Sequence, residues 1–186
     1  MSFFSWLASA IGNRQSAIGG GLRKPKSGSR MPLRFRPQLE TLENRMLPST
    51  YYAATASDLI ADINAANKAG GSNTVVLTAP TTSPYVLTAV DNSKDGSTGL
   101  PMIKKGVTIV GNGDTIERSA AAGIPAFHLF DVANGGSLTL QNLTLQNGNY
   151  NQGGAIHNQG TLALSQVLVQ NNTADGLPGA GGGIWS

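Results

Sequence analysis

The feature that most constrains the fold is a gapless internal repeat near the end of the sequence. Residues 136–149, GSLTLQNLTLQNGN, align with residues 160–173, GTLALSQVLVQNNT, at an offset of 24 residues. A second pair, GGAIHN at 153–158 and GGGIWS at 181–186, recurs at an offset of 28 residues. Self-similarity at such a period indicates a structure built from stacked, similar units.

Short apolar runs, separated by Gly, Asn, Pro and Thr, predict the strands of these units. The expected strands are Thr74–Thr78, Tyr85–Leu87, Val107–Val110, Thr115–Glu117, Ala126–Phe130, Leu138–Leu140, Leu143–Leu145, Ala155–His157, Leu162–Leu164, Val167–Val169 and Gly183–Trp185. So many short strands favour an all-β fold, and the repeat selects a solenoid. We therefore predict a right-handed parallel β-helix with three short strands per coil.

The aligned aliphatic residues are expected to form the inner walls of the coils, because alternate residues of a strand point to the same side. The first wall would hold Leu138, Leu140, Leu162 and Leu164, the second Leu143, Leu145, Val167 and Val169, and the third Phe127, Ile156 and Ile184. One coil cannot bury its own apolar face, so the stability of such a chain comes from stacking.

Asn147 and Asn171 occupy the same corner of successive repeats. Stacked amides at such a corner can form a hydrogen-bonded ladder along the axis. Asn also tolerates the left-handed backbone conformation that a tight corner needs. The sequence leaves both explanations open, and each gives these residues a structural role.

An amphipathic helix is predicted before the strands, at residues 57–69. Thr55 or Ser57 can cap its first turn, and Thr55 has capping-box spacing to Asp58. Gly70 and the glycine after it would end the helix. Its apolar face consists of Leu59, Ile60, Ile63 and Ala66. We expect this helix to cover the exposed apolar end of the first coil.

The charge distribution divides the chain in two. Residues 1–50 hold eight Lys and Arg against two Asp and Glu, a net charge of +6, whereas residues 51–186 hold five against eight, a net charge of −3. The second part thus lacks the basic surface that nucleic acids require, and no nucleic-acid partner is expected. The chain also contains no cysteine, which excludes disulfides and thiolate zinc sites.

Residues 1–50 are predicted to be a disordered basic leader. The apolar piece Phe3–Ile11 is far shorter than the roughly 20 residues of a membrane helix. A targeting role for this piece is the alternative, and Met31 could be a downstream start. Residues 51–186 would then comprise the cap helix and about four coils.

Residues 34–49, RFRPQLETLENRMLPS, resemble the LEPR-type N-terminal motif of large planctomycete surface and exported proteins. The matching residues are Pro37, Leu39, Glu40, Leu42, Glu43, Arg45, Met46, Leu47 and Pro48. The resemblance implies that an export or sorting system binds this segment.

The chain from Ala56 to Ser186 is similar to the right-handed β-helix modules of large bacterial surface proteins. These include the choice-of-anchor type and, more distantly, the chlamydial polymorphic outer-membrane proteins. The similarity lies in the stretches DLIADINAAN, SNTVVL, GGSLTLQNLTLQNG, GGAIHN and GGGIWS, although His157 and Trp185 replace the tyrosine usual after Gly-Gly-x-Ile. It implies a structural or adhesive role at the cell surface, in the outer membrane or outside the cell.

His128, His157 and Trp185 are expected at equivalent positions of the third strand, pointing outward about 4.8 Å apart. Such a column could be a binding stripe for sugar rings, or the imidazoles could hold a metal ion. It could equally be ordinary stacking of like side chains on a solenoid. A metal ion would require carboxylates beside the imidazoles, and Asp131 is the one nearby in the sequence.

Parallel β-helices also include pectate lyases and polygalacturonases, which need clustered carboxylates or a cationic base. The carboxylates of the predicted coils occur singly, at Asp91, Asp95, Asp114, Glu117, Asp131 and Asp175. We therefore predict no catalytic residues, no metal site, no cofactor and no enzyme activity. The alternative is a carbohydrate-active or carbohydrate-binding β-helix whose active coils lie beyond Ser186. The loop 91–95, DNSKD, could bind calcium weakly or be a solvated loop.

The sequence ends inside a repeat signature, and a coil at such an end exposes a strand edge that invites pairing. We therefore expect either a truncated product or a chain that self-associates through its last coil. Surface glycans are the other partners that the repeat suggests.

Overall fold

The computed structural model describes residues 47–176 and 181–186, which belong to one compact unit that spans Leu42–Ser186. In chain order its elements are β1 (Thr50–Ala53), α1 (Ala56–Ala69), β2 (Ser72–Leu77), β3 (Tyr85–Leu87), β4 (Gly106–Val110), β5 (Thr115–Arg118), β6 (Phe130–Val132), β7 (Ser137–Gln146), β8 (Asn149–Tyr150), β9 (Ile156–Asn158), β10 (Thr161–Gln170), β11 (Thr173–Ala174) and β12 (Ile184–Trp185). The predicted leader and the motif residues Pro37, Leu39, Glu40, Leu42, Glu43, Arg45 and Met46 lie outside the described residues. Leu47 and Pro48 directly precede β1.

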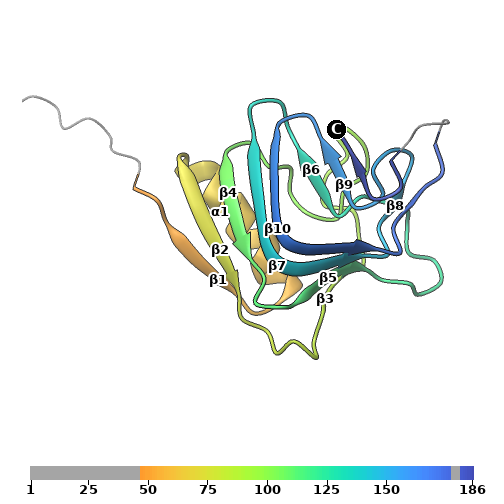
Figure 1. Cartoon of the computed structure of the whole chain (residues 1–186), viewed down its shortest axis with the longest axis horizontal. Coiled ribbons are helices and arrows are strands. Elements are labelled where there is room, and N and C mark those ends of the chain that lie inside the picture. Colours follow the sequence, from red (N-terminus) through yellow and green to blue (C-terminus); the bar gives the residue numbers. More distant parts are fainter. Residues whose placement is uncertain (1–46, 177–180) are drawn as a thin grey trace, which may run out of the picture. The chain divides into compact units, whose positions relative to one another are not determined.

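The strands form three sheets, and each of the strand pairs within them is parallel (Figure 1). The largest sheet has the order β1-β2-β4-β7-β5-β3, with β10 also paired to β7. A second sheet joins β11 to β8, and a third has the order β12-β9-β6. Parallel neighbours need long connections between them, so each pair joins segments that are distant in the sequence. The described part of the chain is rich in parallel strands.

The sequence repeat corresponds to strand pairing in the structure. Leu138 of β7 lies beside Leu162 of β10, which is the 24-residue offset of the repeat. Ile156 of β9 lies beside Ile184 of β12, which is the 28-residue offset. On its other side, Leu138 lies beside Val107 of β4. Residues that are equivalent in the repeat are therefore neighbours in space.

A corner bends β7 and β10 along their length (Figure 1). Leu140 and Leu143 of β7 are buried, but the two residues between them are exposed, so the alternation of buried residues shifts at this point. Asn142 there has a φ of 51°, and Gln166 has a φ of 56° at the same place in β10. The sequence predicted two separate strands on either side of this corner. The structure joins them into one bent strand each, because β7 and β10 pair on both sides of the corner.

Asn147 and Asn171 adopt the left-handed conformation, with φ values of 63° and 53°. This confirms the corner explanation for these residues. The described structure contains no hydrogen bond between their amides, so the ladder predicted there is wrong. The ladder lies one residue earlier, where the Gln170 amide donates to Gln146 at 2.9 Å and Gln146 donates to Glu117 at 2.6 Å.

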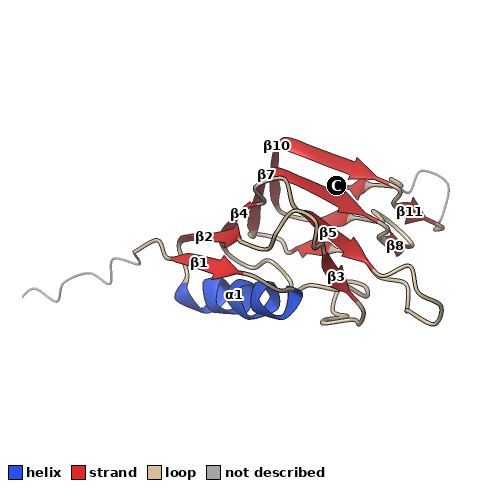
Figure 2. Cartoon of the chain, turned by 90° about the horizontal axis from the view of Figure 1, so that it is seen from below, coloured by secondary structure: helices blue, strands red, loops and turns tan. Residues whose placement is uncertain are grey.

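Helix α1 ends at the predicted residue, Ala69, and begins at Ala56, one residue before the predicted start. The Thr55 hydroxyl accepts a hydrogen bond from the Asp58 amide at 3.1 Å, and Gly70, with a φ of 69°, ends the helix. The helix packs against β1, β2 and β4 (Figure 2). Its buried residues are Leu59, Ile63 and Ala66, whereas Ile60 is half-buried. The helix thus covers the β1–β2 end of the largest sheet.

Two asparagine side chains form hydrogen bonds between the helix and the segments packed beside it. The Asn73 amide donates to the carbonyls of Ala66 and Gly70, and its oxygen accepts from the Ser49 amide at 3.0 Å. Asn67 donates to the carbonyl of Met102 at 2.8 Å. The Asn73 bonds supply donors to carbonyls at the C-terminal end of the helix, whereas the Asn67 bond joins the helix to the segment between β3 and β4.

Three strands were not predicted from the sequence, and one was misplaced. β1, β8 and β11 are short or polar, so no apolar pattern marks them. The strand predicted at Ala126–Phe130 starts instead at Phe130, which lies beside Ile156. Phe127 is buried in the core but does not share the register of the third wall.

The inner residues of β10 are far more exposed than their neighbours on β7. Leu138 and Leu140 are fully buried, but Leu162 is half-buried and Leu164 is 41% exposed. In the described structure β10 pairs with β7 on one side. Burial of the inner wall therefore depends on a strand lying on each side.

Because Leu140 is buried and Leu164 is partly exposed, the same substitution should lower the free energy of unfolding by different amounts at these two equivalent positions. Leu140→Ala should lower the free energy of unfolding by about 2–5 kcal/mol, because it opens a cavity in a filled core. Leu164→Ala, 24 residues later in the same register, should cost less than about 1 kcal/mol because its site already reaches solvent. Chemical denaturation followed by circular dichroism checks both, and equal losses would contradict the inner-wall assignment.

Candidate functional site

The largest concentration of chemically active side chains lies around β6, β8, β9 and β12. We call His128, Asp131, Tyr150, His157 and Trp185 the His cluster. The ring of His157 stacks on Trp185 with centroids 4.7 Å apart and planes 7° apart. The rings of His128 and His157 stack at 5.3 Å and 20°, and Tyr150 meets His128 edge-on at 4.4 Å. The three residues predicted as a column are therefore in contact.

The register explains which of these residues are equivalent. Trp185 lies beside His157, as the repeat predicted. Asp131, not His128, lies beside His157 on the other side, so the predicted equivalence of His128 is wrong. The amides of Leu129 and Phe130 both donate to the carbonyl of Ala155, at 2.9 Å each. This local distortion of the ladder brings His128, just before β6, over the ring of His157.

The rings are not exposed, as an outward column on a solenoid surface would be. His128 is fully buried, His157 is 6% exposed, and Trp185 is half-buried. The burial arises because the segment 92–99 and Tyr150 cover His128, which the strand periodicity could not reveal. An exposed stripe of three rings is thus excluded as a binding surface.

The hydrogen bonds define the state of each imidazole. Nδ1 of His128 lies 2.8 Å from the carbonyl oxygen of Gly153, and Nδ1 of His157 lies 3.0 Å from Oδ1 of Asp131. Carbonyl and carboxylate oxygens accept, so each Nδ1 carries the proton. Nε2 of His128 and Oδ2 of Asp131 are buried without a hydrogen-bond partner. Burial lowers the pKa of His128; His157 adds to this effect, while the Gly153 bond and the Asp131 charge oppose it.

A metal ion between the imidazoles is not supported by this arrangement. The two Nδ1 atoms are engaged with Gly153 and Asp131, and the rings lie nearly parallel rather than converging on one point. Within residues 47–176 and 181–186, no three His, Cys, Asp or Glu side chains gather in a way that could hold a metal ion.

The segment 92–99 closes the cluster and was missed in the sequence. The His128 amide donates to the carbonyl of Ser97 at 2.9 Å, and the Gly99 amide donates to the carbonyl of His128 at 2.8 Å. A Cβ atom on Gly96 would lie 2.9 Å from Nε2 of His128 and from Cε1 of Tyr150. Gly96 also has a φ of 118°, so glycine is required there. The one sequence signal for this contact was Gly96 in the stretch DNSKDGST, and that stretch predicts no more than a loop.

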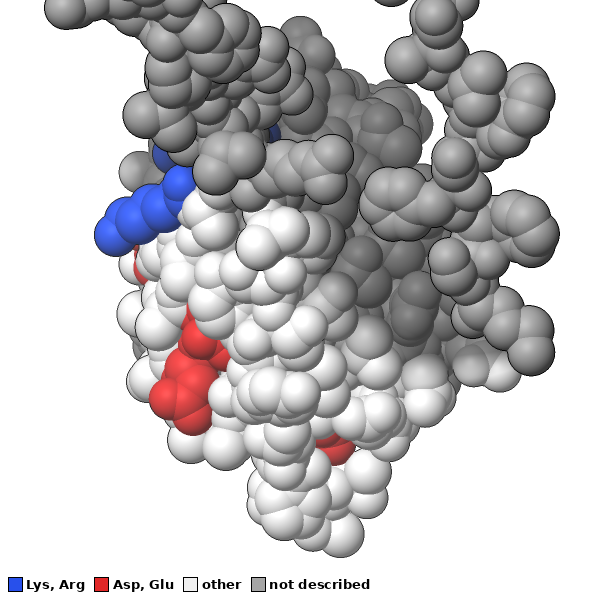
Figure 3. All heavy atoms as spheres, turned by 90° about the vertical axis from the view of Figure 1, so that its left-hand side faces the viewer, with Lys and Arg blue, Asp and Glu red and all other residues white. Residues whose placement is uncertain are grey.

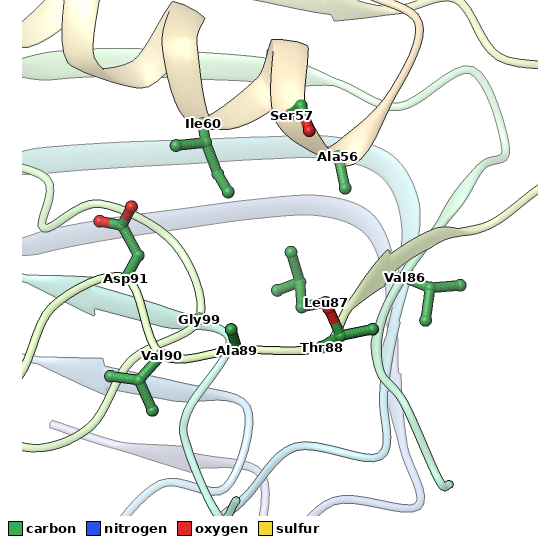
Figure 4. Close-up of a pocket in the computed structure, with 10 residues that line it drawn as sticks. All are labelled: Ala56, Ser57, Ile60, Val86, Leu87, Thr88, Ala89, Val90, Asp91 and Gly99. Atoms are coloured by element: carbon green, nitrogen blue, oxygen red, sulfur yellow. The ribbon is translucent and has the colours of Figure 1, made fainter. Parts of the chain in front are cut away.

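A cavity of about 270 Å³ lies elsewhere, between the first turns of α1 and the segment that follows β3 (Figure 4). Figure 4 shows the side chains of the helix facing that segment across the cavity. The lining residues are Ala56, Ser57, Ile60, Val86, Leu87, Thr88, Ala89, Val90, Asp91 and Gly99. Asp91 is the one ionisable residue among them, and burial raises its pKa. A small apolar group could enter this cavity.

Asp91 also borders a second cavity of about 180 Å³, which includes the region of the predicted calcium loop. Lys94 and Lys104 line this cavity as well. The two ammonium groups would repel a divalent cation, so the geometry favours the solvated loop over the calcium site.

Asp114 is a buried carboxylate in the turn between β4 and β5. Both of its side-chain oxygens lack a hydrogen-bond partner, and burial raises its pKa. Thr115 of β5 pairs with Thr144 of β7. The residues that precede them, Asp114 and Leu143, are therefore equivalent, so this carboxylate occupies the position of an inner leucine in the next repeat. Of the six carboxylates singled out in the sequence, the structure brings Asp131 to His157 and Glu117 to Gln146.

Comparison with protein-family models, with curated proteins and with solved structures finds no match for this chain. The resemblances drawn from the sequence therefore rest on the residues quoted for them. Among the described residues, no helix has the length and apolar character needed to cross a membrane.

The bond between Asp131 and His157 predicts a specific cost. Asp131→Leu leaves the Nδ1 proton of His157 buried without an acceptor, which should lower the free energy of unfolding by about 1–3 kcal/mol. Asp131→Asn retains an acceptor oxygen of the same size and should cost less than half as much. Urea denaturation at pH 7.5 measures both, and equal losses would show that the hydrogen bond does not matter.

Asp114 predicts a gain in stability that depends on pH. Its pKa is raised in the folded state above the ordinary value of 3.8, so ionisation costs stability at neutral pH. This cost disappears as the pH falls and the carboxyl takes up its proton. Asp114→Asn should therefore add about 1 kcal/mol at pH 7 and little at pH 3.5. Asp175→Asn, at an exposed position, serves as the control and should change stability by less than about 0.5 kcal/mol.

Proposed function

We propose that this chain forms a right-handed parallel β-helix and acts as a structural or adhesive scaffold without catalysis of its own. The observation that carries the proposal is the parallel stacking of equivalent strands. β4, β7 and β10 lie side by side in one register, and β6, β9 and β12 lie side by side in another. Each passage of the chain thus adds one strand to each ladder, as the coils of a solenoid do.

The composition of the coils supports a scaffold rather than an enzyme. Residues 132–174 contain no Asp, Glu, Lys or Arg. The outward residues of β7 and β10 are Thr, Ser, Ala, Gln and Leu, which offer no acid or base for sugar chemistry. At the other end of the molecule, where β1 and β2 lie, Figure 3 shows a few acidic and basic side chains among uncharged ones on the described part of the surface. A weakly charged, repetitive surface suits a passive spacer or an adhesive contact.

The connections between strands supply the variation that a display scaffold needs. The segment between β3 and β4 spans residues 88–105, that between β5 and β6 spans 119–129, and that between β8 and β9 spans 151–155. Loops of different length on a constant framework are the usual place for recognition. Adhesive contacts would accordingly lie on these loops.

The location follows from the resemblances, and we propose the cell surface, the outer membrane or the extracellular space. Residues 34–49 would bind the export or sorting machinery. The half-exposed inner wall of β10 supports self-association along this strand. Leu164 on this wall is 41% exposed, Leu168 on the outer face is 53% exposed, and β10 carries no charged residue to discourage pairing.

A carbohydrate-binding role is the second candidate, favoured by one observation. Trp185 is half-buried and lies flat on the ring of His157, which fixes its orientation. A planar aromatic ring held in this way can stack against a sugar ring. The deeper rings of the His cluster are buried and would act as support.

Fractionation of cells that express the full chain tests the proposed scaffold. The protein should occur in the surface or extracellular fraction, and replacing residues 34–49 by a scrambled sequence should retain it in the cytosol. Scrambling residues 19–30, which lie in the leader but outside the motif, is the matched control and should change nothing. Detection of the unaltered chain in the cytosol alone would contradict the location, and release of unsaturated sugars from pectin-like polymers by the purified chain would contradict the scaffold.

A further inference from the structure

His128 is the point at which three parts of the chain meet. Its backbone exchanges two hydrogen bonds with the segment 92–99, and Nδ1 of its ring donates to the carbonyl of Gly153. Its ring also contacts Tyr150 and His157. Any change in the charge of this ring therefore acts on all three parts together.

The site accommodates the neutral imidazole but has no place for a second proton. Because Nδ1 already carries the proton that Gly153 accepts, further protonation must occur at Nε2. Nε2 is buried without a hydrogen-bond partner and lies against Gly96 and Tyr150. A charged imidazolium there would lose its hydration without gaining an acceptor, which is costly.

We propose that protonation of His128 in mildly acidic solution releases the segment 92–99 from the His cluster. The proton on Nε2 reaches water when this segment moves away, because Gly96 of the segment packs against that nitrogen. The segment lies in the middle of the long connection between β3 and β4, which spans residues 88–105. The proposal thus describes an acid-sensitive loop, and it does not depend on the proposed function.

The groups that face His128 do not neutralise the added charge. Asp131 on β6 is the carboxylate whose charge raises the pKa of His128, but its Oδ1 is engaged by His157, which would itself repel a second imidazolium. Tyr150 on β8 presents its ring edge-on. On the covering segment the charged residues are Lys94 and Asp95, which carry opposite charges. β12 contributes Trp185, which is uncharged.

The direction of the effect follows from the open and closed states. In the closed state the segment 92–99 packs on His128, and burial lowers the pKa of its imidazole. In the open state the segment has moved away, so His128 regains access to water and an ordinary pKa near 6.5. The open state therefore binds the proton more strongly, and its population rises as the pH falls below about 6.5. For one proton, the opening constant should increase between pH 7.5 and pH 5.5, by up to about tenfold.

Amide hydrogen exchange measured by NMR provides the test. The amide of Gly99 is the probe, because it donates to the carbonyl of His128 and exchanges when the segment opens. After correction for the intrinsic pH dependence of exchange, its opening constant should rise between pH 7.5 and pH 5.5, by up to about tenfold. An opening constant that does not change over this range overturns the proposal.

Two conservative variants identify the imidazole responsible. His128→Asn keeps a donor near Gly153 but cannot titrate, so the Gly99 opening constant should become independent of pH. His157→Asn is the matched control, since the chain contains two histidines, and it should retain the increase at lower pH. A pH response that persists in the His128 variant, or that disappears in the His157 variant, overturns the assignment. If the His128 variant does not fold, the wild-type measurement alone still decides whether the segment opens in acid.

Discussion

The stacking of equivalent aliphatic side chains between parallel strands is the interaction on which the rest of the structure depends. Val107, Leu138 and Leu162 follow one another across β4, β7 and β10, so each strand buries the inner residues of its neighbour. Removing apolar surface from water is worth roughly 25 cal/mol per Å², and it accumulates with each added strand. Leu164 shows the dependence directly, because it stays partly exposed on the strand that is covered from one side.

This layered burial requires tight corners, and polar residues supply them. Positive φ values occur at Asn142 and Gln166 in the bends inside β7 and β10, and at Asn112, Asn147 and Asn171 between strands or just after a strand end. Asparagine accepts this conformation more readily than most residues. The glutamines beside the corners then bond to one another along the stack, so the same turns carry both the change of direction and a polar ladder.

The interior is not uniformly apolar, and the exceptions are where chemistry can arise. The His cluster places two imidazoles and a carboxylate among buried residues with one hydrogen bond for each ring. Buried polar atoms without partners are costly, and Nε2 of His128 and Oδ2 of Asp131 are two of them. An uncharged imidazole can remain in such a place, whereas a charged one cannot, and this contrast makes the cluster sensitive to pH.

The sequence by itself determined the strand spacing, the inner leucines, the corner asparagines and the capped helix. These features depend on local conformation and on a repeat that can be read by alignment, as with Leu138 and Leu162. The tertiary structure alone decided the position of His128, its burial and its contact with Gly96. The reason is physical, since a small distortion near Ala155 shifts the register, and a loop more than 25 residues earlier in the chain covers the ring. Neither effect has a periodic signal, so neither could be derived from the order of the residues.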